Sequence, residues 1–199
     1  MKLHFAPNTI AVASVLALNE IGADYTLVSV DFASAQQKSD AYLSINPKGR
    51  VPALETDHGI LTETIAILEY AAPGLIPEDP WHAAKMREVM TYLASTAHVN
   101  HAHKMRGARW ADQEASFDDM RRKVPQTMTE TAAYLEAMIE GPFVMGDQVT
   151  LADCYLYPIA MWMPGDGVAL ELFPKLSRYV ELYGSRPAVN RARVDGVLT

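Results

Sequence analysis

The sequence predicts an α/β domain followed by an all-helical domain. In roughly the first 75 residues, strand-like and helical runs alternate in the order β-α-β-α-β-β-α, which is typical of a mixed sheet with helices around it. Residues 73–80 contain three prolines and one glycine, a composition that favours a stiff linker. Beyond them, strand signals mostly vanish. We therefore expect domains at 1–74 and 81–199, joined by a linker at 75–80.

The elements of the first domain follow from periodicity and from turn residues. The first strand ends before Pro7, and the apolar spacing of the next run predicts a helix that stops at Gly22. A hairpin is expected where two short apolar runs flank Asp57-His58-Gly59. The expected elements are strands at 2–5, 25–32, 53–56 and 59–62, and helices at 10–20, 39–45 and 63–72.

The second domain is expected to consist of long helices. One is predicted over 81–105 and another over 116–140, where Pro125 should interrupt or kink it. Thr150 and Asp153 have the spacing of a capping box, which predicts the start of a further helix. A last helix is predicted over 173–183.

Composition excludes several classes of function. A net charge of -7 without a basic patch disfavours a nucleic-acid partner. No apolar run reaches the roughly 18–20 residues of a membrane span, and Pro7 interrupts the N-terminal stretch, which therefore lacks the pattern of a signal peptide. The single cysteine, Cys154, cannot form an internal disulfide, and we expect it to be a buried, small apolar residue. A reducing, cytoplasmic location is expected.

Residues 46–70 carry the strongest functional signal. Val51-Pro52 comes just before a strand, where a cis proline would leave the Val51 backbone free to pair with an extended ligand. Glu63-Thr64 lies where a strand turns into a helix, so backbone N–H groups, a hydroxyl and a carboxylate come together. A peptide that ends in an adjacent ammonium and carboxylate would satisfy these groups. Glutathione is such a ligand.

Six segments carry a resemblance to a known family along almost the whole chain. They are MKLHFAPNT, YLSINPKGRVPAL with LTETIAILEY, YLASTAH, GDQVTLADCYLY and SRPAV. In this order and spacing, the sequence resembles the glutathione transferase superfamily, and among its classes most nearly the bacterial beta class. The resemblance implies a thioredoxin-like N-terminal domain (βαβαββα), a helical glutathione transferase C-terminal domain, and a homodimer.

The resemblance also implies the residues that hold glutathione. Val51, followed by Pro52, would bind the cysteinyl backbone, and Glu63 with Thr64 would bind the γ-glutamyl end. Alternatively, Glu63-Thr64 is only the start of a helix. Arg50 is a candidate contact near the peptide, and Lys38 is a candidate for the glycine carboxylate. Both cations could instead be simply solvated.

A glutathione transferase must stabilise a thiolate, because a free thiol has a pKa of about 8.5 and is mostly protonated at neutral pH. The family places a tyrosine, serine or cysteine after the first strand. This chain has Phe5 at the tyrosine-like position and Ile10 where the beta class has its cysteine. Two polar residues remain there, and we expect Thr9 to donate to the thiolate with Asn8 assisting. Alternatively, Thr9 caps the following helix.

Candidates in the helical domain are weaker. His98 follows YLASTA, as a beta-class active-site histidine follows its own helix segment, and could carry a proton or act as an electrostatic partner. A pocket for the second substrate is expected between the domains, and its candidate lining residues are Tyr92, Met105, Trp110 and Trp162. Alternatively, these four side chains simply pack in the core. His98 and His101 are one helical turn apart, but no fitting ligand cluster accompanies them, so no metal is expected.

The expected activity is conjugation of the glutathione thiolate to a small hydrophobic electrophile, a detoxification reaction. Two alternatives stay open. One is a glutathione-dependent disulfide reductase or peroxidase, and the other is a non-catalytic glutathione-binding module of the same fold.

Overall fold

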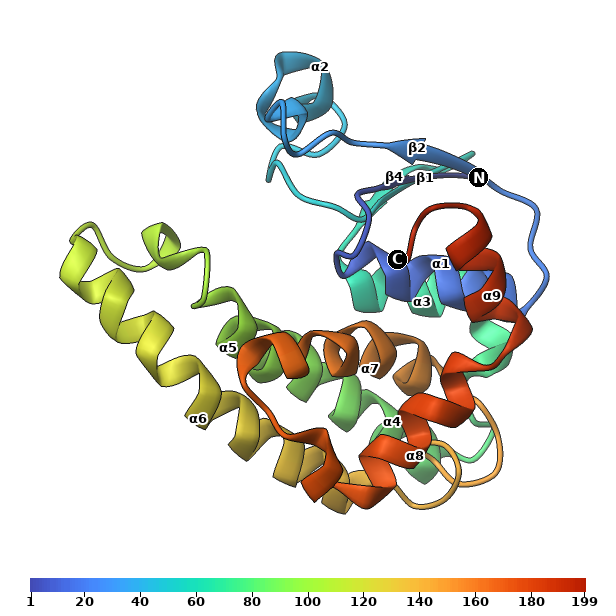
Figure 1. Cartoon of the computed structure of the whole chain (residues 1–199). Helices are drawn as coiled ribbons and strands as arrows, with labels where there is room; N and C mark the ends of the chain where they lie inside the picture. The colour runs from blue at the N-terminus through green and yellow to red at the C-terminus, as the bar shows by residue number, and fades with distance from the viewer. The chain divides into compact units, whose positions relative to one another are not determined.

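The computed structural model describes Met1–Thr199, which form two compact units. The sheet unit comprises Met1–Glu78 and Gly184–Thr199, and the helical unit comprises Asp79–Tyr183. The sheet unit holds a four-stranded mixed sheet with helices, and the helical unit contains no strand longer than an isolated bridge (Figure 1). The predicted fold class is confirmed.

The sheet has the strand order β2-β1-β3-β4. Its strands are β1 (Lys2–Phe5), β2 (Thr26–Ser29), β3 (Ala53–Thr56) and β4 (Gly59–Thr62). β1 and β2 run parallel because helix α1 (Ala11–Glu20) connects them as a crossover, whereas β3 and β4 form the predicted antiparallel hairpin. β1 also pairs with β3, in the antiparallel direction. His4 lies opposite Ala53, and Ala53 lies opposite Thr62.

Four helices belong to the sheet unit: α1 (Ala11–Glu20), α2 (Asp40–Leu43), α3 (Thr64–Ala71) and α9 (Pro187–Val194). α1 packs against both α3 and α9, and Figure 1 shows these three helices on the same side of the sheet. The first eight residues of α1 are buried, which fits its apolar sequence.

Helix α9 was not predicted from the sequence, and residues 81–199 were expected to form one helical domain. In the structure, residues 184–199 belong to the sheet unit, where α9 packs against α1. Arg186, just before α9, binds Glu20 at the end of α1 through two hydrogen bonds, of 2.6 and 2.7 Å. This bidentate ion pair joins positions that are 166 residues apart, and an isolated sequence gives no signal for it.

A buried histidine joins β1 to β3. His4 is 4% exposed, and its Nε2 lies 2.6 Å from Oε1 of Glu55, which Lys2 also approaches at 3.5 Å. The Tyr42 ring meets the imidazole edge-on. The hydrogen bond from His4 is the main cause that holds the pKa of Glu55 below its usual value of 4.5. The charged form of Glu55 is therefore favoured by folding.

We expect Glu55→Gln to destabilise the protein at neutral pH, with an effect that disappears in acid. A carboxyl with a lowered folded-state pKa adds stability above its unfolded pKa, and that stability is lost as the pH falls through the folded-state value. Urea unfolding of both proteins at pH 7 and well below pH 4.5 measures this. A destabilisation that is the same at both pH values would contradict the ion pair.

The helical unit contains α4 (Pro80–Tyr92), α5 (His98–Ala102), α6 (Glu114–Met138), α7 (Leu151–Trp162) and α8 (Pro174–Gly184). The helix predicted over 81–105 is present as α4 and α5, with a π-helical stretch at Leu93–Ala97 between them. α6 continues through Pro125 as one helix. None of the helices combines the length and the apolar character that crossing a bilayer requires.

The predicted capping box at the start of α7 is confirmed. Asp153 Oδ2 accepts hydrogen bonds from the Thr150 N–H and hydroxyl, at 2.8 and 2.9 Å. Its Oδ1 accepts a bond from the Val144 N–H at 2.8 Å, so Asp153 also fixes the preceding loop. Burial raises the pKa of Asp153 to about 6 against the effect of these donors. The next residue, Cys154, is fully buried beside the Tyr183 hydroxyl.

Candidate functional site

The turn before β3 presents the Val51 backbone. The Val51-Pro52 peptide bond is cis, as predicted. The preceding residue is held in place, because the Asn46 amide and the Tyr42 hydroxyl both donate to the Arg50 carbonyl, at 2.7 and 2.8 Å. Neither the N–H nor the C=O of Val51 takes part in a backbone hydrogen bond of the chain. A peptide lying alongside could therefore pair with both groups.

The turn between β4 and α3 presents a carboxylate. Glu63 has a φ of 73°, which is uncommon for a residue other than glycine and is often found at functional sites. Its side chain does not cap α3 and is 70% exposed. Thr64, the first residue of α3, is 8% exposed. An exposed carboxylate thus lies beside the first amides of a helix that no side chain caps.

The Lys48 ammonium lies at the Glu63 carboxylate, a contact that was not predicted from the sequence. Its Nζ lies 2.6 Å from Glu63 Oε1 and 2.7 Å from Thr62 Oγ1. From the sequence, an ammonium of the ligand, and not one of the chain, was expected at this carboxylate. The hairpin itself could have revealed the pair: because Ala53 pairs with Thr62, residues just before β3 must lie near residues just after β4.

The turn after β1 contains Asn8 and Thr9. The Thr9 hydroxyl donates to the Ala6 carbonyl at 2.7 Å and accepts from the Ala11 N–H at 3.3 Å. Thr9 therefore acts at the helix start, and its one proton is bound to the backbone. Asn8 has a φ of 56°, and its amide exchanges two hydrogen bonds with Thr199, at 2.8 and 3.1 Å.

Sheet register brings these turns together. β1 and β3 are antiparallel neighbours, so the residues that follow Phe5 and those that precede Ala53 lie at the same end of the sheet. The residues that follow Thr62 lie at that end too, because β4 runs antiparallel to β3. Three turns, at 6–10, 48–52 and 63–64, thus border one end of the sheet unit.

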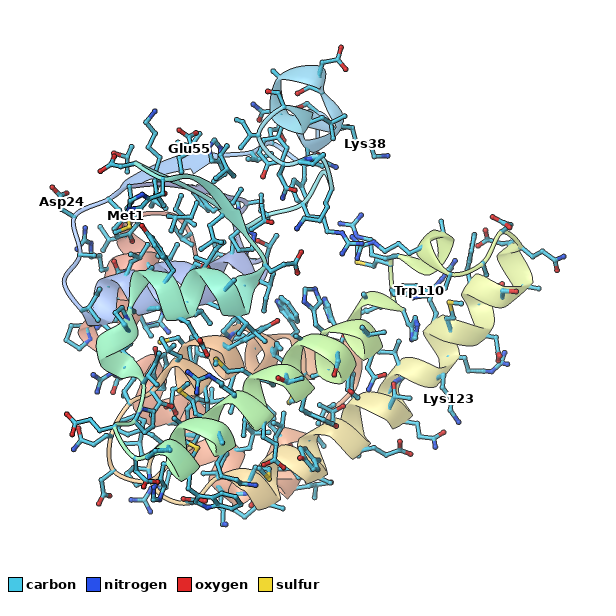
Figure 2. All side chains as sticks on the ribbon, turned by 180° about the vertical axis from the view of Figure 1, so that it is seen from behind. Met1, Asp24, Lys38, Glu55, Trp110 and Lys123 are labelled. Carbon is cyan, nitrogen blue, oxygen red and sulfur yellow. The ribbon has the colours of Figure 1, made fainter.

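The two cationic side chains that are predicted to contact glutathione, those of Arg50 and Lys38, are both exposed. Arg50 directly precedes Val51, whereas Lys38 ends a 3-10 turn over Gln36–Lys38. Figure 2 shows Lys38 directed outward at the edge of the sheet unit. Neither side chain makes an ion pair in the structure, so both roles stay predictions.

The helical unit gathers a second group of residues around Trp162. The His98 ring lies 5.3 Å from the indole, and the His101 ring stacks on it at 4.2 Å. His101 Nδ1 lies 2.6 Å from Oδ2 of Asp166, a side chain with no exposed surface that also binds Lys104 at 3.1 Å. His98 and Trp162 were predicted from the sequence, whereas the buried Asp166 carboxylate that orients His101 was not.

The other predicted pocket residues contact different neighbours. The Tyr92 ring packs at a tilt against that of Tyr134 of α6, with ring centroids 4.2 Å apart, and Trp110 meets His103 edge-on at 4.6 Å. Met105 is 76% exposed and Trp110 is 44% exposed, so neither is a core residue. Figure 2 shows Trp110 on the connection between α5 and α6. The structure describes no group of three His, Cys, Asp or Glu side chains that could hold a metal ion.

Comparisons with known proteins match most of the chain to one family. Residues 1–73 match the glutathione S-transferase N-terminal domain, and residues 85–187 match the glutathione S-transferase C-terminal domain. Glutathione S-transferase GstA of Escherichia coli O157:H7 is 30% identical, with 96% of each chain covered. Maleylacetoacetate isomerase of Pseudomonas aeruginosa is also 30% identical, over 96% of this chain and 95% of that one. A glutathione transferase homologue from Sulfitobacter, solved with bound glutathione, is 48% identical, with a TM-score of 0.97 over 99% of this chain and 98% of the other.

Proposed function

This chain belongs to the glutathione S-transferase family, and from that membership we propose that glutathione binds where the three turns border the sheet. The protein is a glutathione transferase. The observation that carries the assignment is the unpaired backbone of Val51 combined with the exposed carboxylate of Glu63. Val51 pairs with the cysteinyl residue, Glu63 binds the α-ammonium, and Thr64 with the first amides of α3 binds the α-carboxylate.

We propose that the bound thiol is held as a thiolate at the turn after β1. One hydrogen bond to a charged group contributes about 1.5–3 kcal/mol, which corresponds to one or two units of thiol pKa. Thr9 and Asn8 are the proposed donors, and the N-terminus of α1 adds a favourable dipole. For Thr9 to donate, its hydroxyl must rotate away from the Ala6 carbonyl. The thiolate then attacks an electrophilic carbon, a C–S bond forms, and the leaving group departs with its electron pair.

Thr9→Ala is expected to raise the pKa of bound glutathione by about one unit, because the thiolate loses one donor. Thr9→Ser keeps the hydroxyl and serves as the matched control, with an unchanged pKa. Ultraviolet absorbance of the thiolate, titrated against pH with glutathione bound, measures both. An unchanged pKa in Thr9→Ala would assign the stabilisation to Asn8 or to the helix N-terminus.

We infer that the second substrate is a small hydrophobic electrophile that contacts residues of the helical unit. Trp162 and His98 are supported as contacts by their ring packing, and His98 is the proposed proton carrier. Tyr92, Met105 and Trp110 are proposed as further contacts; of these, Met105 and Trp110 expose large apolar surfaces. Detoxification is the corresponding role.

A second candidate function is glutathione-dependent isomerisation. The isomerase of P. aeruginosa and the transferase GstA are each 30% identical to this chain. In such a reaction, the thiolate would add to an unsaturated carbon and later be expelled, so the same glutathione site serves. Rates on a chloronitroaromatic, a cis-unsaturated diacid, a glutathionyl disulfide and a hydroperoxide separate transfer, isomerisation, disulfide reduction and peroxidase activity. Glutathione binding without turnover of any of them would indicate a binding module.

Within the family, we place the chain nearest the beta class, because its quoted segments are most similar to that class. Ile10 stands where that class has a cysteine, and Cys154 is buried in α7. A mechanism that needs a protein thiol is therefore disfavoured, and glutathione supplies the thiol. We also propose a cytoplasmic homodimer that needs no metal, which sedimentation and metal analysis of the purified protein would test.

A further inference from the structure

A cation of the chain lies at the carboxylate that we assign to the ligand's ammonium. Lys48 Nζ binds Glu63 Oε1 at 2.6 Å and Thr62 Oγ1 at 2.7 Å. The two charged side chains are 41% and 70% exposed. An ion pair at this exposure adds little to the stability of a fold. Its main consequence is therefore for what binds beside it.

The backbone around Lys48 is fixed by its own turn. The Lys48 N–H donates to Asn46 Oδ1 at 3.1 Å, and the Gly49 N–H donates to the Asn46 carbonyl at 2.9 Å. Asn46 is 1% exposed, so this support is buried. Gly49 has a φ of 60°, and a Cβ there would approach the Gln37 carbonyl to 3.0 Å. The turn thus sets the position from which the ammonium reaches the site.

The pair of side chains leaves one group of each sign for a ligand. A lysine ammonium has three donors, and two of those of Lys48 are bound to the chain. A carboxylate can accept at both oxygens, and Lys48 binds only Oε1 of Glu63. The first amides of α3 lie next in sequence, at Thr64. The Lys48 ammonium and the Glu63 carboxylate thus lie side by side. An α-amino acid also has an adjacent carboxylate and ammonium, so each of its charges can face the opposite charge of the chain.

We propose that Lys48 determines specificity for the α-carboxylate of the γ-glutamyl end. Lys48 with the α3 N-terminus binds this carboxylate, while Glu63 binds the adjacent ammonium. The site then recognises the amino acid zwitterion as one unit. This inference rests on the proposed glutathione site, and it assigns to Lys48 a contact of its own.

The test measures calorimetric Kd values for Lys48→Met, which keeps an unbranched side chain as far as Cε and removes the ammonium. Three peptides are compared: glutathione, an analogue with 4-aminobutyrate in place of the γ-glutamyl residue, and one with glutarate there. The first analogue lacks only the α-carboxylate, and the second lacks only the α-ammonium. Lys48→Met is expected to weaken glutathione and the glutaryl peptide about tenfold and to leave the aminobutyryl peptide unchanged.

Lys123→Met, at an exposed position of α6, is the control and should change none of the three values. Tighter glutathione binding by Lys48→Met would overturn the inference, because Lys48 would then compete with the ligand for Glu63. Equal weakening of all three peptides would overturn it as well, because Lys48 would then only support the site. Unchanged binding of glutathione by Lys48→Met refutes only the role of Lys48. Failure of the unmodified protein to bind glutathione refutes the proposed function.

Discussion

Replacing Asp153 by alanine is expected to lower the free energy of unfolding by about 3 kcal/mol or more. The substitution leaves the Val144 N–H, the Thr150 N–H and the Thr150 hydroxyl without their acceptor inside the protein. Each buried donor left unsatisfied costs about 1–3 kcal/mol. The gain from removing a buried carboxylate, whose pKa burial raises to about 6, offsets part of this loss. Urea unfolding at neutral pH measures the difference.

Asp147→Ala is the matched control, because Asp147 is exposed in the same loop and makes no ion pair. It should change the free energy of unfolding by less than about 0.5 kcal/mol. Asp153→Asn keeps one carbonyl oxygen as an acceptor, so its loss should be smaller than that of Asp153→Ala. A loss in Asp153→Ala that is no larger than in the control would contradict the role of this residue in joining the loop to α7.

The largest effect on binding is expected for Glu63→Gln. Glutamine has the same shape and can keep the same backbone conformation, so the change removes the charge and little else. A hydrogen bond to a charged group is worth about 1.5–3 kcal/mol, so the Kd for glutathione should rise roughly 10- to 100-fold. Calorimetric titration measures the change. Glu78→Gln, another exposed carboxylate of the sheet unit, should leave the Kd unchanged.

The elements that the sequence predicted well are those that local chemistry decides. Glycine at position 22, the Pro73-Gly74 pair and the Thr150–Asp153 box mark element ends through φ preference, a missing N–H or side-chain capping. The cis bond before Pro52 belongs to this group, because an X-Pro bond adopts the cis form at low cost in a tight turn. Each of these signals lies within a few residues of its effect.

The interactions that the sequence did not reveal join distant positions. Arg186 pairs with Glu20, His101 pairs with Asp166, and Lys48 pairs with Glu63 only once strands or helices have set the register. Helix α9 was missed for the same reason, since it is short and packs against a helix near the other end of the sequence. The sequence favoured Thr9 as a thiolate donor over a role at the helix start, and only the structure shows its hydroxyl bound at the helix start.

The central proposal is that the Glu63 carboxylate binds the α-ammonium of glutathione. A cycle of binding titrations, in which either group or both are removed, tests it most directly. Unmodified protein and Glu63→Gln are each titrated with glutathione and with the glutaryl peptide, which lacks only that ammonium. If the two groups touch, either change alone weakens binding at least tenfold, and both together weaken it hardly further. Losses that multiply would show that Glu63 and the ammonium act independently and would contradict the account.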